Sequence, residues 1–464
     1  MSERLLRGGT VVTADSMKVA DVLIRDGRIA AIESSLETNG DVIDVTGHWV
    51  MPGGIDTHTH LAHPIGRLGV TTADDFYTGT VAGAFGGVTT LLDFGLQDQG
   101  GSLASARDGR LEVIAPDAII DYGFHLIVTD VNESALQEMP RLIESGFPSF
   151  KIYMTYGDKK IADDDLIRLL EVTAKHGGLI YAHCENDCAV THLIERHLAA
   201  GQTGPSYHAT SRPPAVEAEA TNRAIMLAEL AGAPICIAHV TSSGAARHVA
   251  DARARGVPVT AETCPQYLVL DESVYDASGG CEVAKFVCSP PMRASSHVEA
   301  LWDALAAGSI QQVSSDHAPF RFEGQKTGGC EDFTKIPNGL PGIETRLPLL
   351  FTEGVAAGRL SPERFVELTS TGPAQIFGLQ TKGRLEPGAD ADLIVVDPDR
   401  EVEVTAESLH SAVDYSPYEG MKLKGFPSWT LSRGEVIVED GSLRAERGRG
   451  RLVGRGRIEA SSLP

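Results

Sequence analysis

Apolar and polar positions follow one rhythm at the two ends of the chain and another between them. Residues 4–50 alternate short apolar runs with turns, and Asp26-Gly27 between two such runs predicts a β-hairpin. From about residue 50 onward, short β-rich runs alternate with longer helical stretches, and after residue 375 the β-turn pattern returns. The pattern predicts a central α/β region flanked by two all-β segments.

The central region contains eight β-rich runs. The first begins at residue 50, and the others span residues 88–95, 121–129, 149–156, 178–185, 233–241, 257–265 and 310–320. Strands that alternate with helices form parallel βαβ units, so eight units predict an α/β fold, a (β/α)8 TIM-type barrel with insertions. We expect the two terminal β segments to pair into one small β-sandwich domain.

These patterns divide the chain into four segments. Residues 1–51 and 375–449 form the β-sandwich domain, residues 52–374 form the catalytic barrel, and residues 450–464 form a C-terminal tail. The tail is rich in glycine and arginine and has few apolar residues. We therefore expect it to be disordered or to pack on another subunit.

Charge and composition restrict the partners and the compartment. The net charge of -23 argues against nucleic acid or an anionic membrane surface as partner, because phosphates would be repelled. No apolar run is long enough to span a membrane, and the N-terminus lacks the apolar core of a signal peptide. The seven cysteines are an odd number and predict no disulfide framework. A cytoplasmic protein in a reducing compartment is expected.

The segment MPGGIDTHTH, residues 51–60, carries the first candidate chemistry. His58 and His60 are two residues apart at the end of a predicted strand, so both side chains project from the same face. Two neutral imidazoles on one face can chelate a divalent metal ion. Paired histidines are also common as ordinary surface or core residues, so the pair needs support from the rest of the chain.

That support comes from other predicted strand ends, where the active sites of such barrels lie. Polar residues stand there at Lys151, Tyr156, His183, His239 and Asp316. Four histidines and an aspartate suit Zn²⁺, and five protein ligands exceed what one open catalytic zinc needs, so two metal ions are plausible. The ammonium of Lys151 would be repelled there. It must be neutral, point away, or become an anion.

The chain resembles the cyclic-imide amidohydrolases, the dihydropyrimidinase and hydantoinase family of the amidohydrolase superfamily. The resemblance covers nearly the whole chain and rests on motifs specific in order and spacing. These are PGGIDTHTH (52–60), FKIYMTY (150–156), YAHCEN (181–186), IAHVTS (237–242), AETCPQYL (261–268), CSPPMR (288–293), SSDHAPF (314–320) and KIPNGLPGIE (335–344).

The resemblance implies a reaction and its cofactors. A metal-bridging hydroxide would open 5,6-dihydropyrimidines or 5-substituted hydantoins to N-carbamoyl amino acids. Lys151 would be carboxylated to N6-carboxylysine, a carbamate that bridges two divalent metal ions. Zn²⁺ is the favoured ion, with Mn²⁺ and Co²⁺ as alternatives. Homotetramers are usual in the family.

Residue roles follow from the same resemblance. His58 and His60, with Asp316 and the carbamate, would hold one metal ion, and His183 and His239 with the carbamate would hold the other. Asp316 would also act as the general base. Tyr156 would donate its hydroxyl to the developing oxyanion. Ser289 and Asn338 would bind the cyclic imide through main-chain groups.

Three alternatives remain open: an allantoinase-like enzyme, a dihydroorotase-like enzyme and a non-catalytic scaffold. In dihydroorotase-like enzymes an arginine commonly follows the histidine pair and holds the substrate carboxylate. Here the first arginine is Arg67, which counts against an anionic substrate. A scaffold relative would lack the metal ligands, and all six positions are present.

The loop after the first barrel strand, residues 61–75, is expected to close over the exocyclic substituent of the substrate. His63 lies in this loop. We interpret it as a loop residue, and the alternative is that it tunes the pocket or competes for metal.

Overall fold

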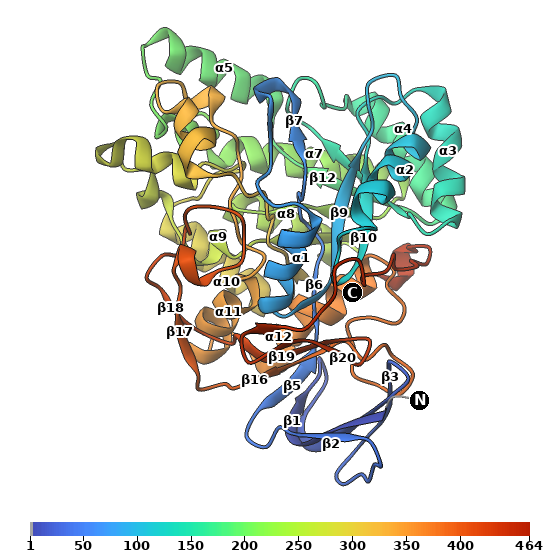
Figure 1. Cartoon of the computed structure of the whole chain (residues 1–464). Helices are drawn as coiled ribbons and strands as arrows, with labels where there is room; N and C mark the ends of the chain where they lie inside the picture. The colour runs from blue at the N-terminus through green and yellow to red at the C-terminus, as the bar shows by residue number, and fades with distance from the viewer. Residues whose placement is uncertain (1–2) are drawn as a thin grey trace.

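The computed structural model describes residues 3–464, and an eight-stranded parallel sheet lies at its centre (Figure 1). Its strands are β6 (Gly54–Asp56), β9 (Val88–Leu96), β10 (Asp121–Ile127), β11 (Ser149–Tyr153), β12 (Leu179–His183), β13 (Ile235–Ile237), β14 (Val259–Thr263) and β15 (Gln312–Val313). Every neighbouring pair is parallel, and past the ends of β15 and β6 Thr59 bridges His317 in parallel. The sheet is thus a nearly closed barrel, and the TIM-barrel prediction is confirmed.

Helices follow the barrel strands and cover them. The helices are α1 (Phe76–Phe85), α2 (Leu103–Ile114), α3 (Glu133–Glu144), α4 (Asp163–His176), α5 (Asp187–Ala199), α6 (Tyr207–Thr210), α7 (Pro214–Ala231), α8 (Ser243–Ala254), α9 (Gln266–Val269), α10 (Ser295–Ala306), α11 (Arg346–Leu350), α12 (Pro362–Val366) and α13 (Gly372–Ile376). Local chemistry sets their ends. Asp75 and Thr78 form a capping box at the start of α1, and α4 ends at Gly177 in the left-handed conformation.

A second sheet of nine strands combines both ends of the chain (Figure 1). Its strands are β1 (Glu3–Val12), β2 (Met17–Arg25), β3 (Arg28–Glu33), β4 (Asp41–Asp44), β5 (Trp49–Pro52), β16 (Leu393–Val396), β19 (Pro427–Ser432), β20 (Glu435–Glu439) and β21 (Ser442–Leu443). The halves meet where β5 pairs with β16 antiparallel, and a separate apolar core packs on this sheet. The remaining strands form two small two-stranded sheets: β7 (Pro64–Ile65) pairs with β8 (Val70–Thr71), and β17 (Glu401–Glu403) pairs with β18 (Lys422–Lys424).

Gly53 separates the two sheets. Strand β5 of the terminal sheet ends at Pro52, and β6 of the barrel begins at Gly54. A Cβ atom at Gly53 would collide with the side chain of Thr89 on β9, so only glycine fits this close approach. The chain therefore enters the barrel at a fixed position, a few residues before the histidine pair.

The C-terminal segment packs on its own barrel, so the expectation of a disordered tail is wrong for these residues. Tyr122 exchanges backbone hydrogen bonds with Arg451 and Val453 (2.9 and 2.8 Å). Arg455 is buried and donates to Ser149 Oγ (2.8 Å) and to the carbonyl of Phe124 (2.7 Å). Composition misled the prediction, because the arginines satisfy buried carbonyls and hydroxyls.

One disulfide is present, whereas the odd number of cysteines predicted no disulfide framework. Cys281 and Cys330 form a disulfide with their Cα atoms 5.2 Å apart. The other cysteines, 184, 188, 236, 264 and 288, are free. Within residues 3–464, none of the helices has both the length and the apolar character needed to cross a membrane.

Candidate active site

The polar residues expected at the strand ends gather at one end of the barrel. Lys151 is the third residue of β11 and His183 is the last residue of β12. His58 and His60 lie just beyond β6 instead of within it. His239 and Asp316 also follow their strands, in the left-handed region at φ values of 34° and 48°.

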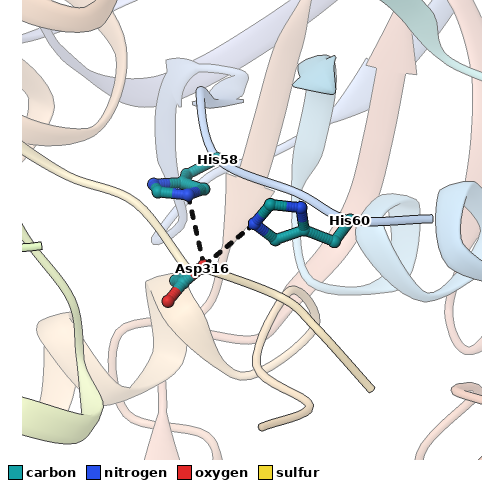
Figure 2. Close-up of side chains that lie close together, drawn as sticks. All are labelled: His58, His60 and Asp316. Carbon is teal, nitrogen blue, oxygen red and sulfur yellow. Dashed lines mark ion pairs between the residues drawn. The ribbon is translucent and has the colours of Figure 1, made fainter. Parts of the chain in front are cut away.

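His58, His60 and Asp316 form a compact cluster (Figure 2). Asp316 Oδ1 lies 3.2 Å from His58 Nε2 and 3.4 Å from His60 Nε2. Burial lowers the pKa of His58 well below its usual range, so this imidazole is neutral at physiological pH. Burial opposes ionisation of Asp316, but His58 and His60 outweigh it and lower its pKa. Two imidazoles that face a carboxylate are a suitable set of metal ligands.

His183 and His239 form a second pair of donors. His183 Nδ1 lies 2.9 Å from His239 Nε2, and His183 Nε2 lies 2.8 Å from Glu185 Oε2. Burial lowers the pKa of both imidazoles. The neutral tautomer of His183 that donates to Glu185 leaves a lone pair on Nδ1, directed at His239. Two ring nitrogens can thus converge on one cation.

Lys151 is fully buried, and its Nζ atom has no hydrogen-bond partner among residues 3–464. The nearest aromatic ring is that of Tyr181, with its centroid 4.4 Å from Nζ. Burial lowers the pKa of this amine to about 8. His60 Nδ1 and His239 Nδ1 are likewise buried without a partner in the described chain. A donor set with this many unsatisfied nitrogens fits divalent cations, provided that the lysine loses its positive charge.

Two buried glutamates, which sequence reasoning missed, orient the histidines. Glu262 Oε1 lies 2.9 Å from His58 Nδ1 and accepts from the backbone N–H of His239 at 3.1 Å. Glu185 holds His183 and accepts from Arg212 at 2.5 Å. An acidic residue inside or just after an apolar strand was the available signal, in YAHCEN and AETCP. Such carboxylates fix the tautomer and the ring orientation of metal-binding histidines.

The residues expected to bind substrate line the same cavity as these donors, a space of about 860 Å³ that includes room open to solvent. Tyr156 adopts a φ of 67°, and burial raises the pKa of its phenol, so the hydroxyl stays protonated and can donate. Asn338 Nδ2 donates to Ser289 Oγ at 2.9 Å. The Arg212 guanidinium lies 5.4 Å from the centre of the Tyr156 ring.

His63, Arg67 and Lys159 also line the cavity. His63 is buried with its ring centroid 5.1 Å from that of His60, so it belongs to the pocket wall. In contrast, His317 lies outside the donor set. Its Nε2 is 3.0 Å from Asp74, and its Nδ1 accepts from the N–H of Gly342.

Known proteins that are similar to this chain in sequence and fold share one type of activity. Residues 49–437 match the model of the Amidohydrolase family. A D-hydantoinase from Geobacillus stearothermophilus is 46% identical over 461 residues, which cover 98% of this chain and 97% of that protein. A D-hydantoinase from Streptomyces coelicolor is 44% identical over 97% of each. The crystal structure of a dihydropyrimidinase from Brevibacillus agri has a TM-score of 0.96 and 44% identity, and the match covers 98% of this chain and 99% of that one.

Proposed function

The chain belongs to the amidohydrolase family, and from this premise we propose that it hydrolyses a ring C–N bond of 5-substituted hydantoins and 5,6-dihydropyrimidines. The products would be N-carbamoyl amino acids. The observation that carries the proposal is the convergence of His58, His60 and Asp316 with the pair His183 and His239 on one cavity. The relatives, which are D-hydantoinases and a dihydropyrimidinase, support the substrate class.

Two divalent cations would be held by the six expected ligands. His58, His60 and Asp316 would bind one, His183 and His239 the other, and Lys151 both. When bound, such ions polarise the substrate carbonyl and make a water molecule nucleophilic near neutral pH. Nitrogen and carboxylate ligands favour Zn²⁺, with Mn²⁺ and Co²⁺ as alternatives.

Lys151 would serve as a ligand after it is carboxylated to N6-carboxylysine. The ammonium first loses a proton to solvent, the neutral amine then attacks CO₂ to form an N–C bond, and a second proton leaves to solvent, so that the side chain becomes a carbamate anion. The low pKa of the buried amine, about 8, supports this step, because a substantial fraction is neutral at physiological pH.

The other side chains would act on the substrate directly. Asp316 takes the proton of the attacking water and passes it to the leaving ring nitrogen. Tyr156 donates its hydroxyl to the oxygen on which negative charge develops. Ser289 and Asn338 hold the imide through their main-chain groups, and the hydrogen bond between their side chains supports this arrangement.

We also propose a homotetramer in the cytoplasm. The resemblance to the hydantoinase family supports the oligomeric state. The five free cysteines favour a reducing compartment, and the Cys281–Cys330 disulfide counts against it. Light scattering in solution should then give a mass near four times the 49.3 kDa of one chain. A monomeric mass would contradict the tetramer.

A substrate panel tests the proposed reaction. Purified protein with measured metal content is assayed on dihydrouracil, dihydrothymine and both enantiomers of several 5-substituted hydantoins. Allantoin and dihydroorotate are included as competitors. We expect the dihydropyrimidines and hydantoins to be turned over faster than allantoin and dihydroorotate. Faster turnover of allantoin or dihydroorotate would support the rival enzymes, and absence of both metal and turnover would support a scaffold.

A further inference from the structure

Two cationic side chains, those of Arg67 and Lys159, line the cavity at what we call its rim. Among residues 3–464, neither Arg67 nor Lys159 forms an ion pair, although Asp158 lies on the same rim. Arg67 donates to the backbone carbonyl of Thr334, at 3.0 Å. Lys159 Nζ lies 5.8 Å from the centre of the Tyr153 ring. Two cations and one acid leave the rim with an excess of positive charge.

His63 adds a third nitrogen donor beside the two cations. Its side chain is 3% exposed, and its Nδ1 atom has no hydrogen-bond partner in the described chain. A buried polar atom without a partner is costly unless a ligand satisfies it. His63 therefore offers a buried ring nitrogen without a partner among residues 3–464 to the group that fills this part of the cavity.

The charged side chains of the rim also change the pKa of Lys159. The pKa of Lys159 is lowered by burial and by Arg67, while Asp158 raises it. A negatively charged group placed between Lys159 and Arg67 would relieve this repulsion and replace the water that a bound substrate displaces. A neutral apolar group would gain nothing from the two cations and would leave them partly desolvated.

We propose that the rim formed by His63, Arg67 and Lys159 recognises an anionic substituent, so that preferred substrates are hydantoins whose C5 side chain ends in a carboxylate. The inference rests on the proposed ring-opening function and names its substrate class. It also revises the interpretation of Arg67. The distance of Arg67 from the histidine pair in the sequence counted against an anionic substrate. In the fold Arg67 lines the cavity.

A pair of matched substrates tests the inference. Hydantoin with a 2-carboxyethyl group at C5 is compared with the same compound carrying a 2-carbamoylethyl group, which has the same shape and no charge. We expect kcat/KM to be about 10-fold higher for the acid, mainly through KM, because the charge acts in binding. The preference should shrink as ionic strength rises.

Variants assign the preference to the rim. Lys159→Gln combined with Arg67→Gln should bring the ratio of acid to amide near unity, and Lys159→Glu should invert it. Asp158→Asn should raise the ratio, since it removes the opposing charge. The matched control is Lys160→Gln, because Lys160 is exposed, pairs with Asp187 at 2.9 Å and does not line the cavity. It should leave the ratio and the activity unchanged.

Two outcomes separate this inference from the proposed function. A ratio near unity in the wild type, or one that Lys159→Gln does not change, overturns the rim while hydantoin turnover still supports ring opening. If no cyclic imide is opened, the proposed function fails. Calorimetry of the metal-loaded protein with N-carbamoylglutamate and N-carbamoylglutamine then tests whether the rim recognises an anionic group. Tighter binding of the acid that is lost in the double variant Lys159→Gln with Arg67→Gln supports the proposal, and equal binding of acid and amide by the wild type overturns it.

Discussion

The amine of Lys151 lies among aromatic rings, where its charge is poorly solvated, and burial lowers its pKa to about 8. Only the neutral amine can attack CO₂, so carbamate formation should accelerate as pH rises from 7 toward 9. We expect metal-free protein depleted of CO₂ to regain activity faster at higher pH, when Zn²⁺ is added at constant dissolved CO₂. A reactivation rate that is flat or falls across this range would contradict a carbamate on Lys151.

Asp316 combines a ligand position with the proposed proton transfer. Asp316→Asn keeps the size of the side chain but removes the basic oxygen. General acid–base catalysis contributes about 10²–10⁴-fold, so kcat should fall by that factor while KM changes little. Metal content is measured on the same sample. A variant that retains both metal ions and full kcat would exclude Asp316 as the base.

Some residues of the site could be predicted from the sequence and others could not. His58, His60, His183 and His239 could be predicted because each stands at the end of a recognisable apolar run. Glu262 could not be assigned, since its partner His58 is 204 positions away and the contact exists only once the barrel closes. The proximity of Arg67 and Lys159 could not be predicted for the same reason, because they lie on different loops that meet only in the folded barrel.

The first residues after the barrel strands position several of the reactive side chains. Tyr156, His239 and Asp316 each adopt a positive φ, between 34° and 67°, in the loop that follows a barrel strand. Residues other than glycine seldom adopt this conformation, and it is held here by the packing of the barrel. Strand periodicity predicts which runs form the barrel, but not these turns, because local propensity disfavours them.

Strand β14 supports two neighbouring ligands through Glu262. Its carboxylate fixes the ring of His58 and the backbone of His239. Glu262→Gln should therefore weaken metal affinity by about 10–100-fold, the usual effect of losing such a support. Competition with a coloured chelator measures this. The matched control is Glu272→Gln, an exposed position outside the cavity. Unchanged affinity in Glu262→Gln would show that β14 has no such role.

The architecture of the whole molecule was largely predictable. Alternating strand and helix patterns predicted the barrel, and the β-turn patterns at both ends predicted one shared β unit, because each follows from a periodic arrangement of apolar residues. The C-terminal segment was not predictable in this way. Its stability comes from single arginine contacts, such as Arg455 with Ser149 and Phe124, that carry no periodic signal.

Arg455 therefore links the C-terminal segment to the barrel, and its loss should destabilise the molecule. Arg455→Met keeps an unbranched side chain but leaves Ser149 Oγ and the Phe124 carbonyl without their donor. Unsatisfied buried groups cost about 1–3 kcal/mol each, so the urea midpoint of unfolding should fall clearly. Arg457→Met, an exposed control whose guanidinium lies 3.3 Å from Glu144, should change it little. Equal midpoints for both variants would contradict this role.

The central claim is that this chain opens cyclic imides with two metal ions held around a carboxylated Lys151. The most direct measurement adds Zn²⁺ stepwise to metal-free protein, with bicarbonate present, and follows hydantoin opening. Wild-type protein should reach full activity at two ions per chain, and Lys151→Ala should retain neither metal nor activity. Full activity without metal, or in Lys151→Ala, would contradict the account.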